Sequence, residues 1–161
     1  MAFNAVRQVS RRALTVVPSR GFAEGVAMDF TFASPARVFY KNADVRQVDV
    51  PSMAGSFGIL PKHVPILATI KPGVVTVFEG AGEGKKYFVS SGTITVNEDS
   101  SVQILAEEAC LVDDIDAQAA RDGLATAQRE LGSATDDVAK AEAQISVEVH
   151  EAIIRAAEQG I

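Results

Sequence analysis

The sequence predicts a β + α chain in which an N-terminal antiparallel β-sandwich is followed by a C-terminal two-helix antiparallel hairpin. Short runs rich in β-branched residues, separated by Gly, Pro or polar breaks at fairly regular spacing, continue to about residue 111. Such spacing is typical of a small sandwich or barrel and disfavours βαβ units. From Asp113 onward alanine becomes the commonest residue, and no proline follows Pro72. We therefore expect a sandwich domain at 23–112 and a hairpin at 113–161.

The expected strands are the runs in which apolar, mostly β-branched residues dominate or alternate with polar ones. A strand of this kind buries one face and leaves the other in water. These runs are 28–32, 38–40, 45–50, 74–78, 87–89, 93–96 and 102–105.

The two helices are expected on either side of a short break at 132–135. Asp113, Asp114 and Asp116 offer an N-terminal cap and negative charge for the first helix. Apolar residues then recur at helical spacing, at Ile115, Ala119, Leu124, Ala127 and Leu131 in the first helix and at Val138, Ala141, Ile145, Val149, Ala152, Ile153 and Ala156 in the second. Because an alanine-rich seam buries little area, the hairpin should dock on its own sandwich, on another subunit, or on both.

The first 22 residues are expected to be a mitochondrial transit peptide. They contain four arginines and no acidic residue, and Phe3, Val6, Ala13, Leu14 and Val17 can share one helix face. The stretch at 20–23 resembles a cleavage site before Ala23. A surface or disordered helix is the alternative.

The rest of the chain is acidic, with eleven basic against 21 acidic residues. Phosphates repel such a body, so nucleic acid is not an expected partner. No apolar run is long enough to cross a bilayer, and any membrane association should be peripheral. The single cysteine, Cys110, cannot form an internal disulfide and is expected to be a small buried apolar residue.

No residue pattern indicates catalysis, a metal site or a cofactor. The glycine-rich stretch at 80–86 fails the phosphate-loop spacing and joins two strands, which favours a hairpin loop. His63 and His150 have no Cys or acidic residue at metal-ligand spacing.

The stretch at 55–65 differs from the rest because it combines two glycines, two prolines and a histidine with apolar residues. It predicts a tight loop that presents Phe57, Ile59 and Leu60 at one end of the sandwich. The loop is interpreted either as a structural corner or as a surface that binds a partner.

Residues 55–65, continued by 67–77, resemble the signature of a rotor-stalk family, the δ subunit of mitochondrial ATP synthase and its bacterial counterpart ε. The stretches 88–96 and 105–116 resemble the later strand pair and the passage into the hairpin of that family. The second helix, at 140–145 and 148–156, looks closer to mitochondrial δ chains. The resemblance covers residues 26–158.

The resemblance implies a non-catalytic subunit at the foot of the central stalk, peripheral to the matrix side of the mitochondrial inner membrane. Its implied partners are the γ subunit, the polar loops of the c-ring and a small mitochondrial stalk subunit. Two sets of contact residues follow by position within the motif: Ser56, Phe57 and Gly58 for the c-ring, and Leu60, His63 and Val64 for γ.

A nucleotide-sensing regulatory module of the same fold is the alternative function. Bacterial ε chains often carry an apolar residue and an Asp ahead of an Arg-Ala pair. Aligned on Arg155 and Ala156, this chain has Glu151 and Ala152 at those positions, which counts against ATP sensing. An unrelated matrix enzyme would require a catalytic cluster that the sequence does not show.

Overall fold

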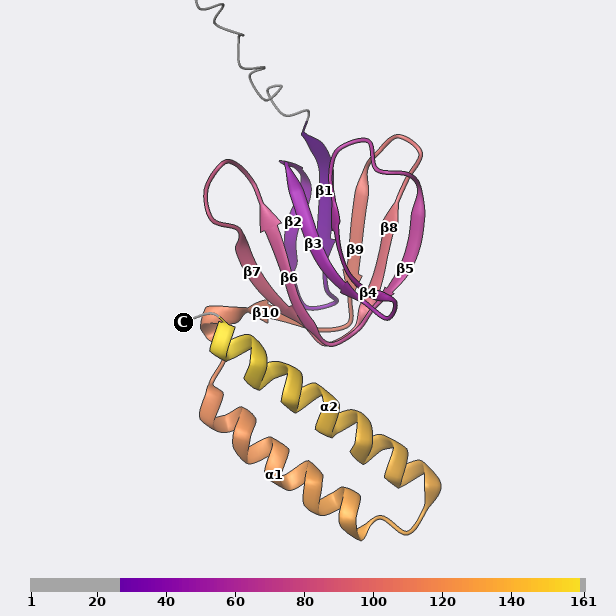
Figure 1. Cartoon of the computed structure of the whole chain (residues 1–161), viewed down its shortest axis with the longest axis vertical. Coiled ribbons are helices and arrows are strands. Elements are labelled where there is room, and N and C mark those ends of the chain that lie inside the picture. Colours follow the sequence, from indigo (N-terminus) through magenta and orange to yellow (C-terminus); the bar gives the residue numbers. More distant parts are fainter. Residues whose placement is uncertain (1–26, 160–161) are drawn as a thin grey trace, which may run out of the picture.

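The computed structural model describes residues 27–159, so the expected transit peptide at 1–22 lies outside the described residues. A strand-rich body is followed by two long helices (Figure 1). The strands are β1 (Met28–Ala33), β2 (Val38–Val45), β3 (Gln47–Ser52), β4 (Gly55–Ile59), β5 (Ile66–Ile70), β6 (Gly73–Phe78), β7 (Lys85–Val89), β8 (Gly92–Val96), β9 (Val102–Ala106) and β10 (Ala109–Leu111). A 3₁₀ turn, η1 (Val112–Asp114), leads into α1 (Ala117–Ser133) and α2 (Asp137–Gln159).

The strands form a sandwich of two layers that meet at one point. One layer has the order β10-β7-β6-β3-β4 and the other β5-β8-β9-β1-β2. A single residue pair, Ser52 with Ile70, joins β3 to β5. All neighbours are antiparallel except β1 and β9, which are parallel. The predicted sandwich and hairpin are thereby confirmed, with one parallel pair in a mainly antiparallel fold.

The strands β4, β5 and β10 were absent from the predicted set. Gly55–Ile59, predicted as part of a tight loop, is an edge strand paired along its whole length with β3. β5 was not predicted because prolines at 61, 65 and 72 surround it, and proline disrupts a strand pattern even when it lies just outside the strand.

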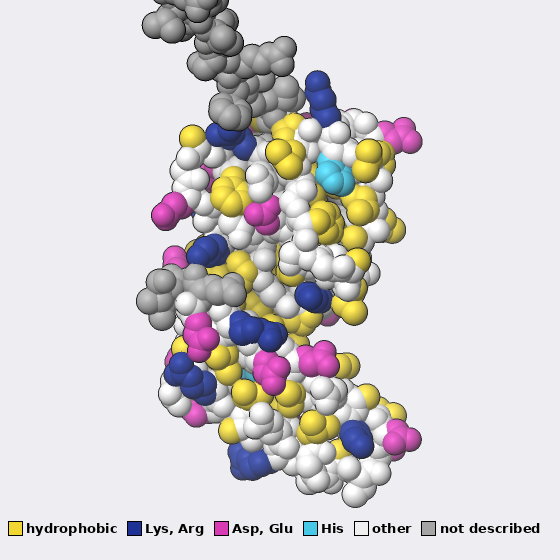
Figure 2. Space-filling view, in the orientation of Figure 1, with side chains coloured by type: hydrophobic (Ala, Val, Ile, Leu, Met, Phe, Trp, Pro, Cys, Tyr) yellow, Lys and Arg dark blue, Asp and Glu magenta, His cyan; other side chains and the backbone are white. Residues whose placement is uncertain are grey.

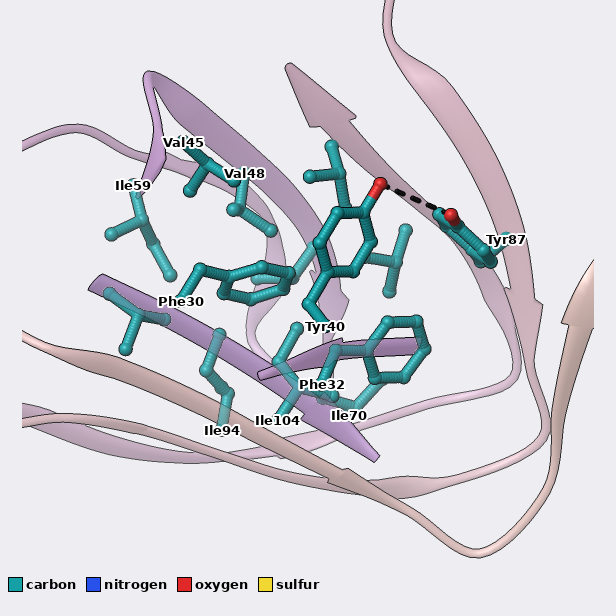
Figure 3. Close-up of a cluster of buried hydrophobic side chains, with 14 of the residues drawn as sticks. Phe30, Phe32, Tyr40, Val45, Val48, Ile59, Ile70, Tyr87, Ile94 and Ile104 are labelled. Atoms are coloured by element: carbon teal, nitrogen blue, oxygen red, sulfur yellow. Dashed lines mark hydrogen bonds between the residues drawn. The ribbon is translucent and has the colours of Figure 1, made fainter. Parts of the chain in front are cut away.

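The core lies between the two layers and consists mainly of valine, isoleucine and aromatic side chains (Figure 3). β9 shows the underlying alternation, since Val102, Ile104 and Ala106 are buried while Gln103 and Leu105 are exposed. Phe30 and Phe32 of β1 are fully buried, and Phe32 meets Tyr87 edge to face at 5.4 Å between ring centroids.

The helical hairpin attaches to the sandwich through the outer face of β6 and β7. β7 buries Tyr87 and Val89 in the core and turns Phe88 toward the helices. Phe88, Val112, Ala152 and Ala156 form a second buried cluster, against which Val74, Cys110, Ile115 and Ile153 pack. The expectation that the hairpin docks on its own sandwich is therefore confirmed. Only the end of α2 and the start of the hairpin take part, and the far ends of both helices project away (Figure 1).

The two helices pack along a seam of small residues. Asp116 caps α1, its carboxylate accepting hydrogen bonds from the backbone N–H of Gln118 and Ala119. Ala120 and Ala127 of α1 are buried, as are Ala143 and Val147 of α2.

Candidate partner-binding surface

The predicted contact residues lie on β4 and on the turn that follows it. Along β4, Ser56 and Gly58 are exposed, Phe57 is half-buried, and Ile59 is fully buried in the core. The expectation that Ile59 is presented to a partner is wrong, because strand pairing with β3 turns every second side chain of β4 inward. Leu60, the next residue, is 55% exposed.

Gly58 leaves room for a pair of side chains on β3. Gln47 Nε2 donates a hydrogen bond to Asp49 Oδ1 over 2.7 Å. A Cβ added at Gly58 would lie 2.7 Å from that Asp49 oxygen and 3.4 Å from Gln47 Nε2. A side chain at Gly58 would therefore displace this pair. The glycine leaves the space beside β4 that the side chains of Gln47 and Asp49 occupy.

The turn at 60–63 is closed by a hydrogen bond from the backbone N–H of His63 to the carbonyl of Leu60, 3.1 Å long. Pro61 fixes its first corner. Lys62 has a φ of 66°, in the left-handed region. The ring nitrogen Nδ1 of His63 lies 2.9 Å from the carbonyl oxygen of Val64, which accepts from the Nδ1–H tautomer. The turn thus has a defined backbone geometry and presents the side chains between Leu60 and Val64.

The structure brings the two predicted contact sets together. The rings of Phe57 and His63 lie with their centroids 6.4 Å apart and their planes tilted by 33°. The residues expected to meet the c-ring and those expected to meet γ are therefore neighbours on one continuous surface. Val64 is 70% exposed, and His63 is half-buried.

This surface continues onto the outer face of β5, β8 and β9. Leu67 of β5 is 74% exposed and lies opposite Thr95, while Leu105 of β9 is 59% exposed and lies opposite Thr93. Thr69 and Gln103 complete this uncharged set of outward-facing strand residues. Figure 2 shows hydrophobic side chains gathered on this part of the sandwich around a histidine. Large exposed apolar areas of this kind mark protein interaction sites.

A second exposed apolar face lies on α2. Val138 and Ile145 are 63% and 61% exposed, and Ala141 between them is also exposed. These three residues were predicted to share one apolar stripe with Val149, Ala152, Ile153 and Ala156. In the structure this stripe docks on the sandwich at its C-terminal end, at Ala152 and Ala156, and its exposed N-terminal part has no partner among residues 27–159. The buried residues of the hairpin seam, Ala143 and Val147, lie on another side of α2.

A cleft of about 340 Å³ lies where the end of α2 meets the sandwich. Ser56 lines it together with Lys71 and Arg155, and small or apolar residues form the rest of its wall: Pro51, Pro72, Gly73, Val74, Ala152 and Ala156. Ser56 therefore lies both on the exposed edge strand and beside the hairpin. No sequence pattern predicts this proximity, since residues 56 and 155 are distant along the chain.

The glycine-rich stretch is a hairpin loop between β6 and β7, as predicted. Glu79 at its start accepts hydrogen bonds from Lys85 Nζ at 2.7 Å and from the Tyr40 hydroxyl at 2.8 Å, which lower the pKa of its carboxyl. Burial raises the pKa of the Tyr40 hydroxyl, and the hydrogen bond that it donates to the Glu79 carboxylate raises it further. Tyr40 also accepts a hydrogen bond from the Tyr87 hydroxyl over 3.1 Å. These contacts anchor the loop to the sandwich.

Cys110 is half-buried in the cluster between sandwich and hairpin. Burial raises the pKa of its thiol, and the carboxylates of Asp114 and Glu108 raise it further. A thiol in this environment has little thiolate character and is a weak nucleophile. Residues 27–159 contain no cluster of three potential metal ligands, and no helix among them has the length and hydropathy of a membrane span.

Two family models match the chain. The β-sandwich domain of the ATP synthase Delta/Epsilon chain matches residues 27–112, and the C-terminal domain of the metazoan delta subunit of F1F0-ATP synthase matches residues 115–156. The mitochondrial ATP synthase subunit delta of Caenorhabditis elegans is 48% identical over 151 residues, covering 89% of this chain and 92% of the relative. That of Yarrowia lipolytica is 41% identical over 156 residues, covering 95% of each.

Solved structures show the same fold. A chain in the mitochondrial ATP synthase of Euglena gracilis, in a structure of OSCP, F1 and c-ring, matches with a TM-score of 0.74 at 22% identity, covering 86% of this chain and 88% of that one. A chain in the central stalk and c-ring of Tetrahymena thermophila mitochondrial ATP synthase matches with a TM-score of 0.62 at 16% identity, covering 83% and 98%. With both domains matched in order and near-complete coverage of the relatives, the chain belongs to the delta/epsilon family of ATP synthase subunits and, within it, to the mitochondrial delta subunits.

Proposed function

We propose that this chain is a non-catalytic rotor subunit of the central stalk of mitochondrial F-type ATP synthase. It links the γ subunit to the c-ring on the matrix side of the inner membrane and transmits rotation for ATP synthesis. Family membership supports this proposal, as do the assemblies named for the two solved structures, OSCP/F1/c-ring and central stalk/c-ring.

One observation carries the proposal: a single body exposes two apolar surfaces, one on each of its parts. Leu60, Val64 and Leu67 are exposed on the sandwich, and Val138 and Ile145 on α2. A chain that acted alone would have no physical reason to leave both surfaces in water. A coupling subunit needs separate contacts to separate neighbours, held on a stiff body. The sandwich supplies that stiffness, because its core is closely packed and its strands are paired across both layers.

The contact assignments keep the two residue sets predicted from the motif, all of which are exposed except the half-buried Phe57 and His63. Ser56, Phe57 and Gly58 of β4 meet the polar loops of the c-ring, and Leu60, His63 and Val64 meet γ. The exposed face of α2 lies against γ or the small stalk subunit. A protein surface already fixed by strand pairing and by a proline turn loses little freedom on binding, which favours affinity.

Cross-linking in the assembled enzyme tests these contacts. In a Cys110→Ala background, Ser56→Cys and His63→Cys would each be the sole cysteine of the chain. The complex would be reconstituted in mitochondrial membranes and treated with a short thiol-to-amine cross-linker. Glu98→Cys, exposed in the turn after β8, is the matched control.

The proposal expects a product with the c subunit from Ser56→Cys and a product with γ from His63→Cys, at higher yield than from Glu98→Cys. Exchange of the two partners would overturn the assignment but retain the rotor role. If neither γ nor c is cross-linked by either variant, and a tagged chain recovers no γ from gently solubilised membranes, the rotor role itself is refuted.

A further inference from the structure

Lys62 occupies a backbone conformation that lysine seldom adopts. Its φ is 66°, and it is the third residue of the turn from Leu60 to His63. A turn with Pro at its second position and a positive φ at its third favours glycine or asparagine there, because a Cβ crowds the backbone in the left-handed region. Lysine at this position is therefore a local strain that the turn itself does not require.

The charged side chain of Lys62 belongs to the turn that exposes the apolar residues Leu60 and Val64. Leu60 and Val64, two residues before and after it, are 55% and 70% exposed. Lys62 is itself exposed and has no ion-pair partner anywhere in the described chain, residues 27–159. The strand residues that continue this surface, Thr93, Thr95 and Leu105 among them, are uncharged. Lys62 is thus the charged group among the residues named for this surface, which otherwise offer apolar, hydroxyl, amide and imidazole side chains.

We propose that Lys62 is a specificity-determining contact, which pairs with a carboxylate on the subunit that covers Leu60 and Val64. This inference rests on the proposed function, in which that subunit is γ. Residues with a strained backbone are enriched at functional sites. A cation presented by a stiff turn at the edge of an apolar contact fixes the register of the partner and speeds association through complementary charge.

Affinity for the δ-depleted F1–γ subcomplex tests the proposal. The full mature chain and its variants would be titrated against the same subcomplex at about 50 mM and about 500 mM NaCl, concentrations chosen to span weak and strong screening. Lys62→Gly removes both charge and strain, Lys62→Asn removes the charge and tolerates the left-handed backbone, and Lys62→Arg keeps the charge. Ser100→Gly is the matched backbone control, since Ser100 has a φ of 68° in the turn after β8.

Lys62→Gly and Lys62→Asn are each expected to weaken binding about tenfold at low salt and much less at high salt. Lys62→Arg should bind nearly as the unaltered chain. Lys62→Gly should at the same time raise the melting temperature of the free chain by about 2–5 °C, since it relieves strain. Ser100→Gly should raise the melting temperature without changing the affinity. Loss of affinity with gain of stability separates a contact from a structural role.

Leu60→Ala and Val64→Ala make the outcomes distinguishable. If these two variants weaken binding while Lys62→Gly does not, the surface is the contact but Lys62 is not, and this inference is overturned. A Lys62→Gly chain that self-associates with unchanged affinity would show that the lysine only keeps the apolar surface soluble. If none of the variants changes affinity, both the inference and the assignment of this turn to γ are refuted.

Discussion

Ile59 and Leu60 are consecutive apolar residues with opposite environments. Ile59 is fully buried between the layers, whereas Leu60 is 55% exposed at the end of β4. Their chemistry is nearly identical, so nothing in their side chains distinguishes a core residue from a contact residue. The pairing of β4 with β3 makes the distinction, because Ile59 lies opposite Val48 and shares its inward orientation.

Alanine substitutions at these two positions should therefore differ strongly. Ile59→Ala removes a fully buried side chain and is expected to lower the free energy of unfolding by about 2–5 kcal/mol. Leu60→Ala should change it by no more than about 0.5 kcal/mol, because it removes exposed atoms. Urea unfolding followed by circular dichroism measures both. Equal losses for the two variants would contradict the burial of Ile59 and the register of β4.

At the scale of single elements, α2 is apolar on more than one side. Ala143 and Val147 face α1, Ala152 and Ala156 face the sandwich, and Val138 with Ile145 faces solvent. Val138 and Ile145 continue, at helical spacing, the side of α2 that docks on the sandwich at Ala152 and Ala156, and an exposed apolar helix face of this kind is a binding surface. This distribution supports a contact with another subunit along the projecting part of the hairpin.

The two helices approach each other closely at Gly123. A Cβ there would meet the imidazole of His150, whose Nδ1 lies 2.8 Å from the carbonyl oxygen of Ser146 one turn earlier. Glycine in a helix interior is unfavourable by about 1 kcal/mol relative to alanine, so its presence reflects this close approach.

A double-mutant cycle measures that approach. Gly123→Ala is expected to destabilise the chain by about 1 kcal/mol, despite the better helix propensity, because the added methyl displaces the half-buried ring of His150. In a His150→Ala background the same change should stabilise it by about 1 kcal/mol. Thermal unfolding of the four proteins gives the coupling. If Gly123→Ala stabilises both backgrounds equally, the two positions are not in contact.

At the scale of the whole molecule, the two parts are joined by a small contact. Four buried residues form its centre, and two of them, Ala152 and Ala156, are alanines that bury little area. The sandwich core does not depend on the hairpin, because its buried cluster lies between the two sheets. The arrangement of the parts is therefore less strongly fixed than either part.

A buried charge should separate the parts without unfolding the sandwich. Ala156→Asp places a larger, charged side chain in the cluster around Phe88 and is expected to detach the hairpin, since Ala156 is fully buried and both overpacking and desolvation of a carboxylate are unfavourable. Small-angle scattering should show a larger radius of gyration, and hydrogen exchange should become faster in α2 but not in β9. Ala141→Asp, exposed on the same helix, is the control and should leave both measurements unchanged. Loss of protection throughout the sandwich would show that the parts fold as one unit.

The sequence by itself determined the two-part architecture, most strands and both helices. Local physics explains why: β-branched alternation ends near residue 111, and Asp116 caps the helix that follows at Ala117. It also showed that the glycine-rich stretch at 80–86 is a hairpin loop. The signature at 55–65 pointed to the family, because its combination of glycine, proline and histidine is unusual, and the contact surface that it predicts stays a prediction.

Only the tertiary structure decided which apolar residues face inward. Strand pairing buried Ile59 and left Leu60 exposed, and docking of α2 on β6 and β7 explains the continuous burial of Tyr87, Phe88 and Val89. The packing of the two helices against each other likewise decided that Ala143 and Val147 of α2 are buried while Val138 and Ile145 are exposed. Each of these depends on contacts between residues far apart in the chain, and periodicity records only the spacing within one element.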